Sequence, residues 1–144
     1  MEIIYHITQV EQIASYLIDE FKTIKCWFLN GELGAGKTTL IKSFGQYLKV
    51  KEKVTSPSFA LVHEYKTIDN KEIAHIDLYR LNKESELSEI HFEEIINQKD
   101  FTFIEWGKKF PQTISKQSYH LSIDISILDI EYRKLTCHKS FPIF

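Results

Sequence analysis

The chain has few cysteines and no long apolar run, and these absences exclude several classes of protein. Its two cysteines, Cys26 and Cys137, lack the paired spacing of a metal or redox site, so we expect two free, buried thiols. No apolar stretch approaches the roughly 18 residues that a membrane span needs, and the first residues lack the basic and apolar regions of a secretion signal. We therefore expect a cytoplasmic protein that does not associate with membranes.

Proline and glycine are also scarce, with three and five residues among 144. No linker rich in them divides the chain and no internal repeat is present, so residues 1–144 are expected to form a single domain. The formal net charge of −2 gives none of the strong positive field that autonomous nucleic-acid-binding proteins usually carry. If RNA is a ligand, we expect another protein to hold it.

The most informative segment is a phosphate-binding loop with the pattern G-x-x-x-x-G-K-T. It directly follows the apolar residues 26–29 and precedes a segment with apolar side chains at helical spacing. This order of strand, loop and helix is the context that a genuine phosphate loop requires. We expect a nucleoside triphosphate to bind at Gly31, Glu32, Leu33, Gly34, Ala35, Gly36, Lys37, Thr38 and Thr39.

The residue types in this loop follow from the chemistry of phosphate. Successive backbone N–H groups must turn inward to surround an anion, and the three glycines relieve the crowding that side chains would cause. Lys37 is then placed to reach the β- and γ-phosphates, and the Thr38 hydroxyl is placed to bind Mg²⁺. Thr39 is expected to help hold the α-phosphate.

The rest of the chain predicts alternating strands and helices. Apolar patterns predict strands over residues 1–7, 26–29, 59–65, 73–79, 101–104, 119–127 and 132–138. Thr8 and Glu11 form a capping box that should open a helix, and a break in helical register near His91 predicts two short helices or a kink. The turn around Asp69 and Asn70 predicts an antiparallel hairpin. We expect an α/β fold of the P-loop NTPase type, with three layers and a mixed sheet flanked by helices.

Two carboxylates follow predicted buried strands, where a phosphate loop needs a second metal contact and a group that orients water. Alternation in residues 73–80 places Asp77 on the polar face of its strand, which makes it a candidate Mg²⁺ ligand. Glu105 arrives as the apolar strand of residues 101–104 ends, and it is the candidate for orienting or activating water. The expected catalytic residues are Lys37, Asp77 and Glu105, and the expected metal ligands are Thr38, Asp77 and Glu105.

Several neighbouring residues have two interpretations. Trp106, which we assign to the nucleotide site, also fits a core position. Arg80 could contact phosphate, although an exposed ion pair is the commoner role, and His75 fits a structural histidine better than a ligand. Thr55, Ser56 and Ser58 could belong to a loop that senses the γ-phosphate, but Ser-Pro is also an ordinary turn signal.

Four motifs, in this order and spacing, resemble the TsaE (YjeE-type) family. They are GELGAGKTT at residues 31–39, VTSPSF at 54–59, HIDLYR at 75–80 and Glu105 with Trp106. The resemblance covers essentially the whole chain. It implies a bacterial ATPase that is required for making threonylcarbamoyladenosine in tRNAs that read codons beginning with A.

The resemblance also implies roles for particular residues. By position, Lys37 and Thr38 match the family's phosphate and Mg²⁺ contacts, and Asp77 matches its metal-site aspartate. Glu105 and Trp106 match a pair that the family needs for function. The resemblance further implies an accessory protein that docks on a TsaB–TsaD enzyme pair and uses nucleotide turnover to reset it, with tRNA contacted only indirectly.

The chain departs from the family's usual sequence at three places. Ser58 stands where threonine is usual, which keeps a hydroxyl. Gly107 stands where proline usually follows the Glu-Trp pair, which could loosen that loop. Near His91 the family often has a glycine, which this chain lacks. None of the three departures removes a charged group from the expected chemistry.

Three other functions fit a phosphate loop. A small-molecule kinase usually needs an arginine-bearing lid, but the chain has only Arg80 and Arg133. A GTPase should carry Asn/Thr-Lys-x-Asp, whereas in the nearest stretch, residues 97–100, the lysine comes one position too late, so ATP is preferred over GTP. A module that senses nucleotide and binds a partner with little hydrolysis remains an alternative to an ATPase.

Overall fold

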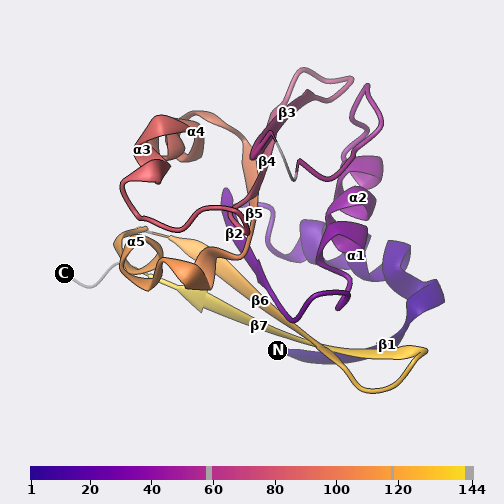
Figure 1. Ribbon diagram of the computed structural model, residues 1–144. Helices are drawn as coiled ribbons and strands as arrows, with labels where there is room; N and C mark the ends of the chain where they lie inside the picture. The colour runs from indigo at the N-terminus through magenta and orange to yellow at the C-terminus, as the bar shows by residue number, and fades with distance from the viewer. Residues whose placement is uncertain (58–59, 118, 142–144) are drawn as a thin grey trace.

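The strands of the chain lie side by side in one mixed sheet (Figure 1). The computed structural model describes residues 1–57, 60–117 and 119–141, and its seven strands have the order β1-β7-β6-β2-β5-β4-β3. They are β1 (Glu2–His6), β2 (Cys26–Asn30), β3 (Val62–Lys66), β4 (Glu72–Asp77), β5 (Phe101–Glu105), β6 (His120–Ile127) and β7 (Tyr132–Ser140). The pairs β2–β5, β2–β6 and β4–β5 are parallel, while β1–β7, β6–β7 and β3–β4 are antiparallel. The predicted mixed sheet is therefore confirmed.

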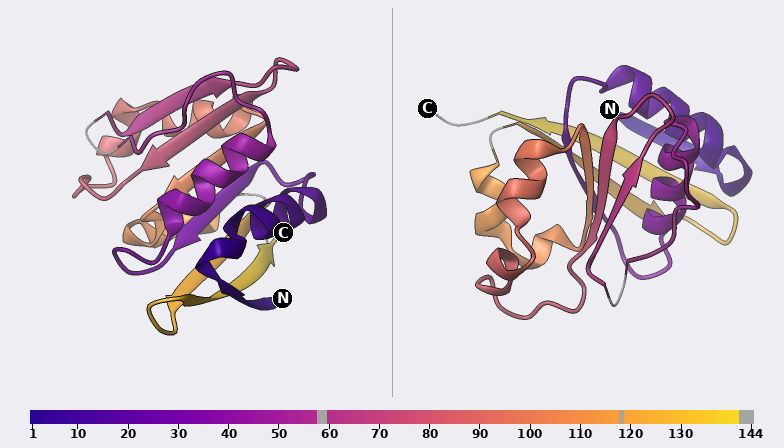
Figure 2. Two further views of the ribbon diagram at one scale, coloured as in Figure 1. Left: turned by 90° about the vertical axis from the view of Figure 1, so that its right-hand side faces the viewer. Right: turned by 90° about the horizontal axis from the view of Figure 1, so that it is seen from above.

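Helices cover both faces of this sheet and give the predicted three layers (Figure 2). One face carries α1 (Val10–Glu20) and α2 (Lys37–Tyr47), and the other carries α3 (Glu86–Glu89), α4 (Phe92–Gln98) and α5 (Pro111–Lys116). Two short 3-10 turns, η1 (Ile7–Gln9) and η2 (Gly107–Lys109), precede α1 and α5. Within the described ranges, no helix has both the length and the apolar character that crossing a membrane requires.

The central strands are buried on both faces, as their continuous apolar sequences predict. Every residue of β2 and β5 is buried. Trp27 packs on the side of α1 and α2, where its ring meets Phe44 and Phe103 edge-on, while Phe28 packs on the opposite side of the sheet. The Trp27 indole N–H donates to the carbonyl of Ile24 at 2.6 Å, so its one polar group is satisfied. Two apolar layers therefore fix the strands that carry the site.

The first helical segment begins differently from the prediction. The expected capping box between Thr8 and Glu11 is wrong, because the chain enters the 3-10 turn η1 directly after His6. The Nδ1 atom of His6 accepts a hydrogen bond from the Thr8 N–H at 3.1 Å, and the His6 N–H donates to Oε1 of Gln9 at 2.9 Å. The imidazole thus takes the capping role that a Ser or Thr hydroxyl usually has.

Other element boundaries also differ from the prediction. The strand expected over residues 59–65 is β3, which begins only at Val62 because Leu61 has a left-handed φ of 66°; Phe59 lies outside the described residues. The strand β4 ends two residues earlier than expected. The break predicted near His91 is confirmed, since this residue has a φ of 57° and separates α3 from α4.

Both cysteines are free and buried, as predicted. Burial raises the pKa of Cys26 to about 12 and that of Cys137 to about 11. Thiols with such pKa values stay protonated at neutral pH and react slowly with oxidants and alkylating reagents. The two residues therefore serve as small apolar groups of the core.

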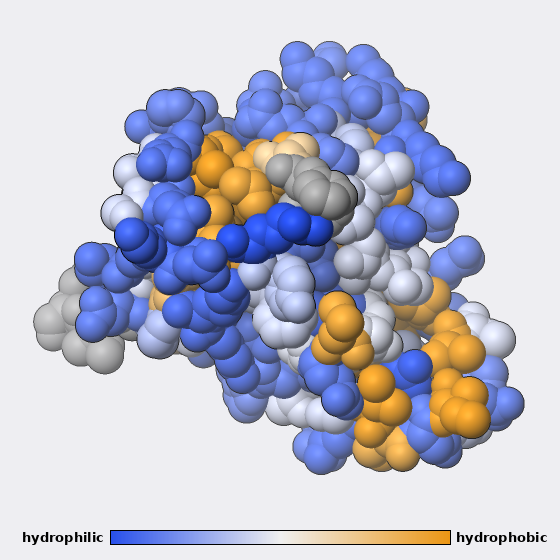
Figure 3. Space-filling model, in the orientation of Figure 1, coloured by the Kyte–Doolittle hydropathy of each residue, from blue (hydrophilic) through white to orange (hydrophobic). Residues whose placement is uncertain are grey.

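The turn between β6 and β7 carries apolar side chains outside the core (Figure 3). Leu128 and Ile130 are 50% and 88% exposed, and the apolar atoms at the lower right of the figure lie over this turn and β1. Arg133 connects the turn to the phosphate loop, because its guanidinium donates to the carbonyl of Asp129 at 2.8 Å and to that of Ala35 at 3.2 Å. One side chain thus links the exposed turn to the loop.

Replacing Gly107 with alanine should destabilise the fold. A Cβ atom at this position would lie 2.5 Å from Cδ1 of Phe28, a ring that is 1% exposed and closely packed. Overpacking of this kind costs about 1–3 kcal/mol, which should appear as a lower free energy of unfolding in urea titrations. Lys108→Ala, in the same 3-10 turn but exposed, should change it by less than about 0.5 kcal/mol. Equal effects of the two substitutions would contradict this packing argument.

Candidate phosphate and metal site

The predicted phosphate loop joins the end of β2 to the start of α2. All three of its glycines are favoured by geometry: a Cβ on Gly31 would lie 2.7 Å from the carbonyl oxygen of Ile125, and Gly34 and Gly36 have left-handed φ values of 82° and 109°. α2 begins at Lys37, directly after Gly36. The N–H groups of its first turn therefore have no intrahelical partners, and they carry the positive end of the helix dipole. Such a helix start attracts anions.

Most of the residues predicted for the site line one cavity of about 410 Å³ beside this helix start. The cavity is lined by Leu33, Gly34, Gly36, Lys37, Thr38, Thr39, Ser56, Asp77, Tyr79, Arg80, Glu105 and Trp106. Gly31 and Glu32 line an adjoining hollow of about 540 Å³ together with Trp106. Ala35 is 1% exposed, and its methyl group belongs to the core instead. Ser58 lies outside the described residues.

Parallel pairing brings the two predicted carboxylates to this cavity. β5 lies between β2 and β4, and the register aligns Glu105 with Leu29 on one side and with Asp77 on the other. The carboxyl ends of the three strands therefore meet at the edge of the sheet where the phosphate loop begins. This is the edge at which open α/β sheets bind their ligands.

Glu105 accepts hydrogen bonds from two sides. The Thr38 hydroxyl lies 3.0 and 3.1 Å from its two carboxylate oxygens, and Nε2 of His75 lies 2.6 Å from Oε2. Glu105 is 3% exposed and His75 is fully buried. A buried carboxylate requires such partners, because an unpaired charge in the interior is costly. The carboxylate is thus held between the phosphate loop and β4.

Lys37 is folded back over its own loop. Its ammonium group donates to the carbonyl of Gly31 at 2.5 Å and to that of Glu32 at 3.2 Å, and it lies 4.1 Å from the centre of the Trp106 ring. Burial lowers the pKa of Lys37, and the negative charge of Glu105 opposes that shift. The indole is held there by a left-handed backbone at Trp106, with a φ of 63°.

Asp77 is less completely paired than Glu105. It is 8% exposed, and its Oδ1 atom accepts a hydrogen bond from the N–H of Tyr79 at 3.0 Å. Burial raises the pKa of this carboxyl, the Tyr79 hydrogen bond lowers it, and the nearby charge of Glu105 raises it further. A carboxylate whose charge is disfavoured in this way is typical of a functional site.

Three oxygen-bearing side chains at the cavity fit Mg²⁺. Thr38, Asp77 and Glu105 offer a hydroxyl and two carboxylates, the hard ligands that Mg²⁺ prefers. Nowhere among the described residues does a group of three or more His, Cys, Asp or Glu side chains form a metal site by itself. The donor set therefore fits an ion that completes its coordination with water and phosphate oxygens.

Two contacts of the site were missed from the sequence. His75 is buried and hydrogen-bonded, which agrees with a structural histidine, but the sequence did not show that its partner is Glu105; the available signal was its position two residues before Asp77, on the same face of the strand. The contact of Arg133 with the loop carbonyl of Ala35 had no sequence signal, because it depends on the β6–β7 turn. Arg80 is exposed and also lines the cavity, so its position agrees with both of its predicted interpretations.

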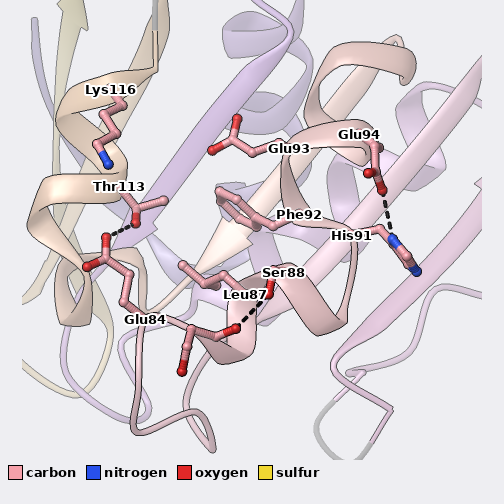
Figure 4. A pocket seen from close by; sticks show the side chains of 10 residues that line it. Glu84, Leu87, Ser88, His91, Phe92, Glu93, Glu94, Thr113 and Lys116 are labelled. Carbon is pink, nitrogen blue, oxygen red and sulfur yellow. Dashed lines mark hydrogen bonds and ion pairs between the residues drawn. The ribbon is translucent and has the colours of Figure 1, made fainter.

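A separate hollow of about 480 Å³ lies between α3, α4 and α5 (Figure 4). Its lining includes Glu84, Glu93 and Glu94, with Glu84 accepting a hydrogen bond from Thr113 and Glu94 paired with His91. The three carboxylates share this hollow with one lysine, Lys116, whereas the cavity at the glycine-rich loop has Asp77 and Glu105 matched by Lys37 and Arg80. A polyphosphate is therefore repelled more strongly by the hollow than by the loop cavity.

Fold and site together define an α/β protein of the P-loop NTPase type. A family model described as threonylcarbamoyl adenosine biosynthesis protein TsaE matches residues 4–135. The chain belongs to the TsaE family. The crystal structure of Bacillus subtilis YdiB has the same fold, with a TM-score of 0.69, 22% identity and coverage of 97% of this chain and 86% of that one.

Relatives named tRNA threonylcarbamoyladenosine biosynthesis protein TsaE agree with this membership. The protein of Haemophilus influenzae is 32% identical over 133 residues, which cover 80% of this chain and 84% of the relative. The protein of Aquifex aeolicus is 37% identical over 113 residues, which cover 77% of this chain and 74% of the relative. A relative from Nostoc is 42% identical over 86 residues, and this match spans only 52% of its length.

Asp77→Asn should stabilise the protein in the absence of ligand at neutral pH. Because its pKa is raised by folding, the charged Asp77 carboxylate destabilises the folded state above that pKa, and the cost vanishes as the carboxylate takes up a proton at lower pH. Asparagine removes the charge, and we expect a gain of about 0.5–2 kcal/mol in unfolding free energy at pH 7. The gain should shrink toward about pH 4.

Asp124→Asn is the matched control for this experiment, since Asp124 also lies on a central strand but its side chain is 36% exposed beside Lys108. It should give no gain at either pH. A loss of stability in Asp77→Asn that persists at both pH values would show that the charge of Asp77 does not destabilise the fold.

Proposed function

We propose that this protein is an ATP-binding, Mg²⁺-dependent ATPase that assists a TsaB–TsaD-type enzyme pair in making threonylcarbamoyladenosine in tRNA. Membership of the TsaE family supports the place in tRNA modification. The observation that carries the ATPase assignment is the contact between Thr38 of the phosphate loop and Glu105 at a neighbouring strand end. This contact brings a hydroxyl and a carboxylate together in the cavity, which supports a shared role for them in holding Mg²⁺.

Each residue has a definite task in this proposal. The loop amides and the start of α2 hold the phosphates, and Lys37 exchanges its loop carbonyls for β- and γ-phosphate oxygens. Thr38 and Glu105 would hold Mg²⁺, which supplies positive charge to the phosphate oxygens during transfer. Asp77 would join them as a further metal ligand, directly or through water, and Glu105 would also orient the attacking water. Trp106 keeps the lysine at the loop through a cation–π contact.

The nucleotide is proposed to be ATP because residues 97–100, the stretch that most resembles the guanine-binding motif of GTPases, bind other residues of the chain instead. Lys99 contacts Glu64 and Glu72 at 3.2 and 3.6 Å, and the carboxylate of Asp100 accepts a hydrogen bond from the Glu72 N–H at 2.8 Å. Asp100 directly precedes β5, whereas Glu105 ends it. The motif therefore lies at the opposite end of this strand from the phosphate loop.

The proposed contact with tRNA is indirect. The chain has a formal net charge of −2, so it lacks the positive field that would hold a polyanion by itself. The enzyme pair would bind the tRNA, and this protein would act on the pair through nucleotide turnover. A second candidate, a nucleotide sensor with little hydrolysis, is favoured by the pairing of Lys37 and Glu105 with protein groups, which leaves both engaged before nucleotide binds.

Lys37→Ala should weaken ATP binding strongly. Hydrogen bonds to charged groups contribute about 1.5–3 kcal/mol, so a loss of roughly 10- to 150-fold in affinity is expected by calorimetric titration with Mg-ATP. Lys42→Ala, which removes an exposed lysine from the same helix, should leave the affinity within about twofold. Wild-type affinity in Lys37→Ala would contradict the proposed phosphate contact.

Glu105→Gln distinguishes the ATPase from the sensor. In an ATPase this change should lower hydrolysis by about 100-fold or more, measured with the TsaB–TsaD-type pair and tRNA present, because the lost charge acts on both metal and water. Glu94→Gln, an exposed change on α4, should have no effect. The sensor is favoured if the wild-type protein binds ATP but shows no hydrolysis under any of these conditions. Normal hydrolysis in Glu105→Gln would show that Glu105 takes no part in the reaction.

A further inference from the structure

His75 is the most deeply buried titratable side chain at the site, and the proposed chemistry does not use it. It is 0% exposed on β4, and its Nε2 atom lies 2.6 Å from Oε2 of Glu105. Hydrogen bonds to a carboxylate at such a distance are short and strong. Oε2 of Glu105 thus has His75 as a buried partner in addition to the Thr38 hydroxyl, which lies 3.1 Å away.

The sheet register holds this pair in place. β4 and β5 are parallel, with Asp77 opposite Glu105 and His75 opposite Phe103, so His75 reaches diagonally across one strand spacing to the carboxylate. Both residues lie on buried central strands, which are more rigid than loops. The orientation of the Glu105 carboxylate is therefore set by the sheet as well as by the phosphate loop.

The other ring nitrogen indicates which tautomer is present. Nδ1 of His75 is buried, and among the described residues it has no hydrogen-bond partner. A buried N–H without an acceptor is costly, so we assign the proton to Nε2, which donates it to Glu105. The imidazole is then a directional donor that presents a single N–H to the carboxylate.

We propose that His75 is a positioning residue that holds Glu105 in the orientation required for the Mg²⁺–nucleotide complex, without touching the nucleotide. The inference rests on the proposed function. Thr38 donates its hydroxyl proton to Glu105, so the orientation of the carboxylate also sets the direction in which the lone pairs of the hydroxyl oxygen point. Hydrogen-bond partners behind metal ligands typically contribute 10- to 100-fold to metal affinity or activity.

The test compares Mg²⁺ dependence of ATP binding in His75→Ala and His75→Gln. ATP affinity is measured by calorimetry across a Mg²⁺ titration, and hydrolysis with the enzyme pair and tRNA is measured separately. His75→Ala should lower the apparent Mg²⁺ affinity by about 10- to 100-fold while metal-free ATP affinity stays within about twofold. His75→Gln should recover much of the loss, because its side-chain amide N–H can replace Nε2–H.

His120→Ala is the matched control. His120 is also a buried strand histidine with an Nδ1 atom that has no partner in the described part of the chain, but it does not line the cavity. Its replacement should leave Mg²⁺ dependence unchanged even where thermal stability falls. Thermal melts of each variant establish that it is folded, and His75→Gln carries the test if His75→Ala does not fold.

Two outcomes would overturn the inference. Wild-type Mg²⁺ dependence in folded His75 variants would show that Glu105 needs no positioning, and equal losses in His75→Ala and His120→Ala would show a general effect of core damage. Failure of the proposed function looks different, since the wild-type protein itself would then show no Mg²⁺-dependent ATP binding.

Discussion

The hydrogen bond between the Thr38 hydroxyl and the Glu105 carboxylate is the contact on which the site depends. It joins the first turn of α2 to the end of β5, across 67 residues of sequence. The bond requires β2 and β5 to be parallel and in the register that aligns Leu29 with Glu105. That register is fixed by buried rings such as Trp27 and Phe103, which pack edge-on between the sheet and α2. The aromatic core thus determines where the carboxylate meets the phosphate loop.

Lys37 shows how the site keeps a cation ready without a ligand. Its ammonium is bound by two neutral carbonyls and an aromatic face, and burial lowers its pKa while Glu105 and Asp77 oppose that change. Phosphate oxygens carry charge and are stronger acceptors than carbonyls. In the proposed function, an arriving triphosphate would take the ammonium from these carbonyls, and Trp106 would then either follow the lysine or lose its contact.

Features that depend on neighbouring residues in the sequence could be predicted, whereas contacts between strands distant in the sequence could not. The phosphate loop could be read directly, because its glycines, lysine and threonine are consecutive, and strand alternation placed Asp77 correctly on the polar face of β4. The partnership of His75 with Glu105 could not be read, since it depends on the pairing of two strands distant in sequence. The cap at His6 was missed because an imidazole seldom replaces a hydroxyl there.

The turn after β5, which carries Trp106, is held in place by packing from a neighbouring strand. A left-handed backbone at a residue such as Trp106 costs about 1–3 kcal/mol, so the surroundings must hold it. Gly107 leaves room for the Phe28 ring, whose Cδ1 atom lies 2.5 Å from the place a Cβ would take. A proline ring there would need the space that Phe28 fills. The turn that keeps the indole over Lys37 is therefore held by packing from β2, which also carries the phosphate loop, rather than by the fixed φ of a proline.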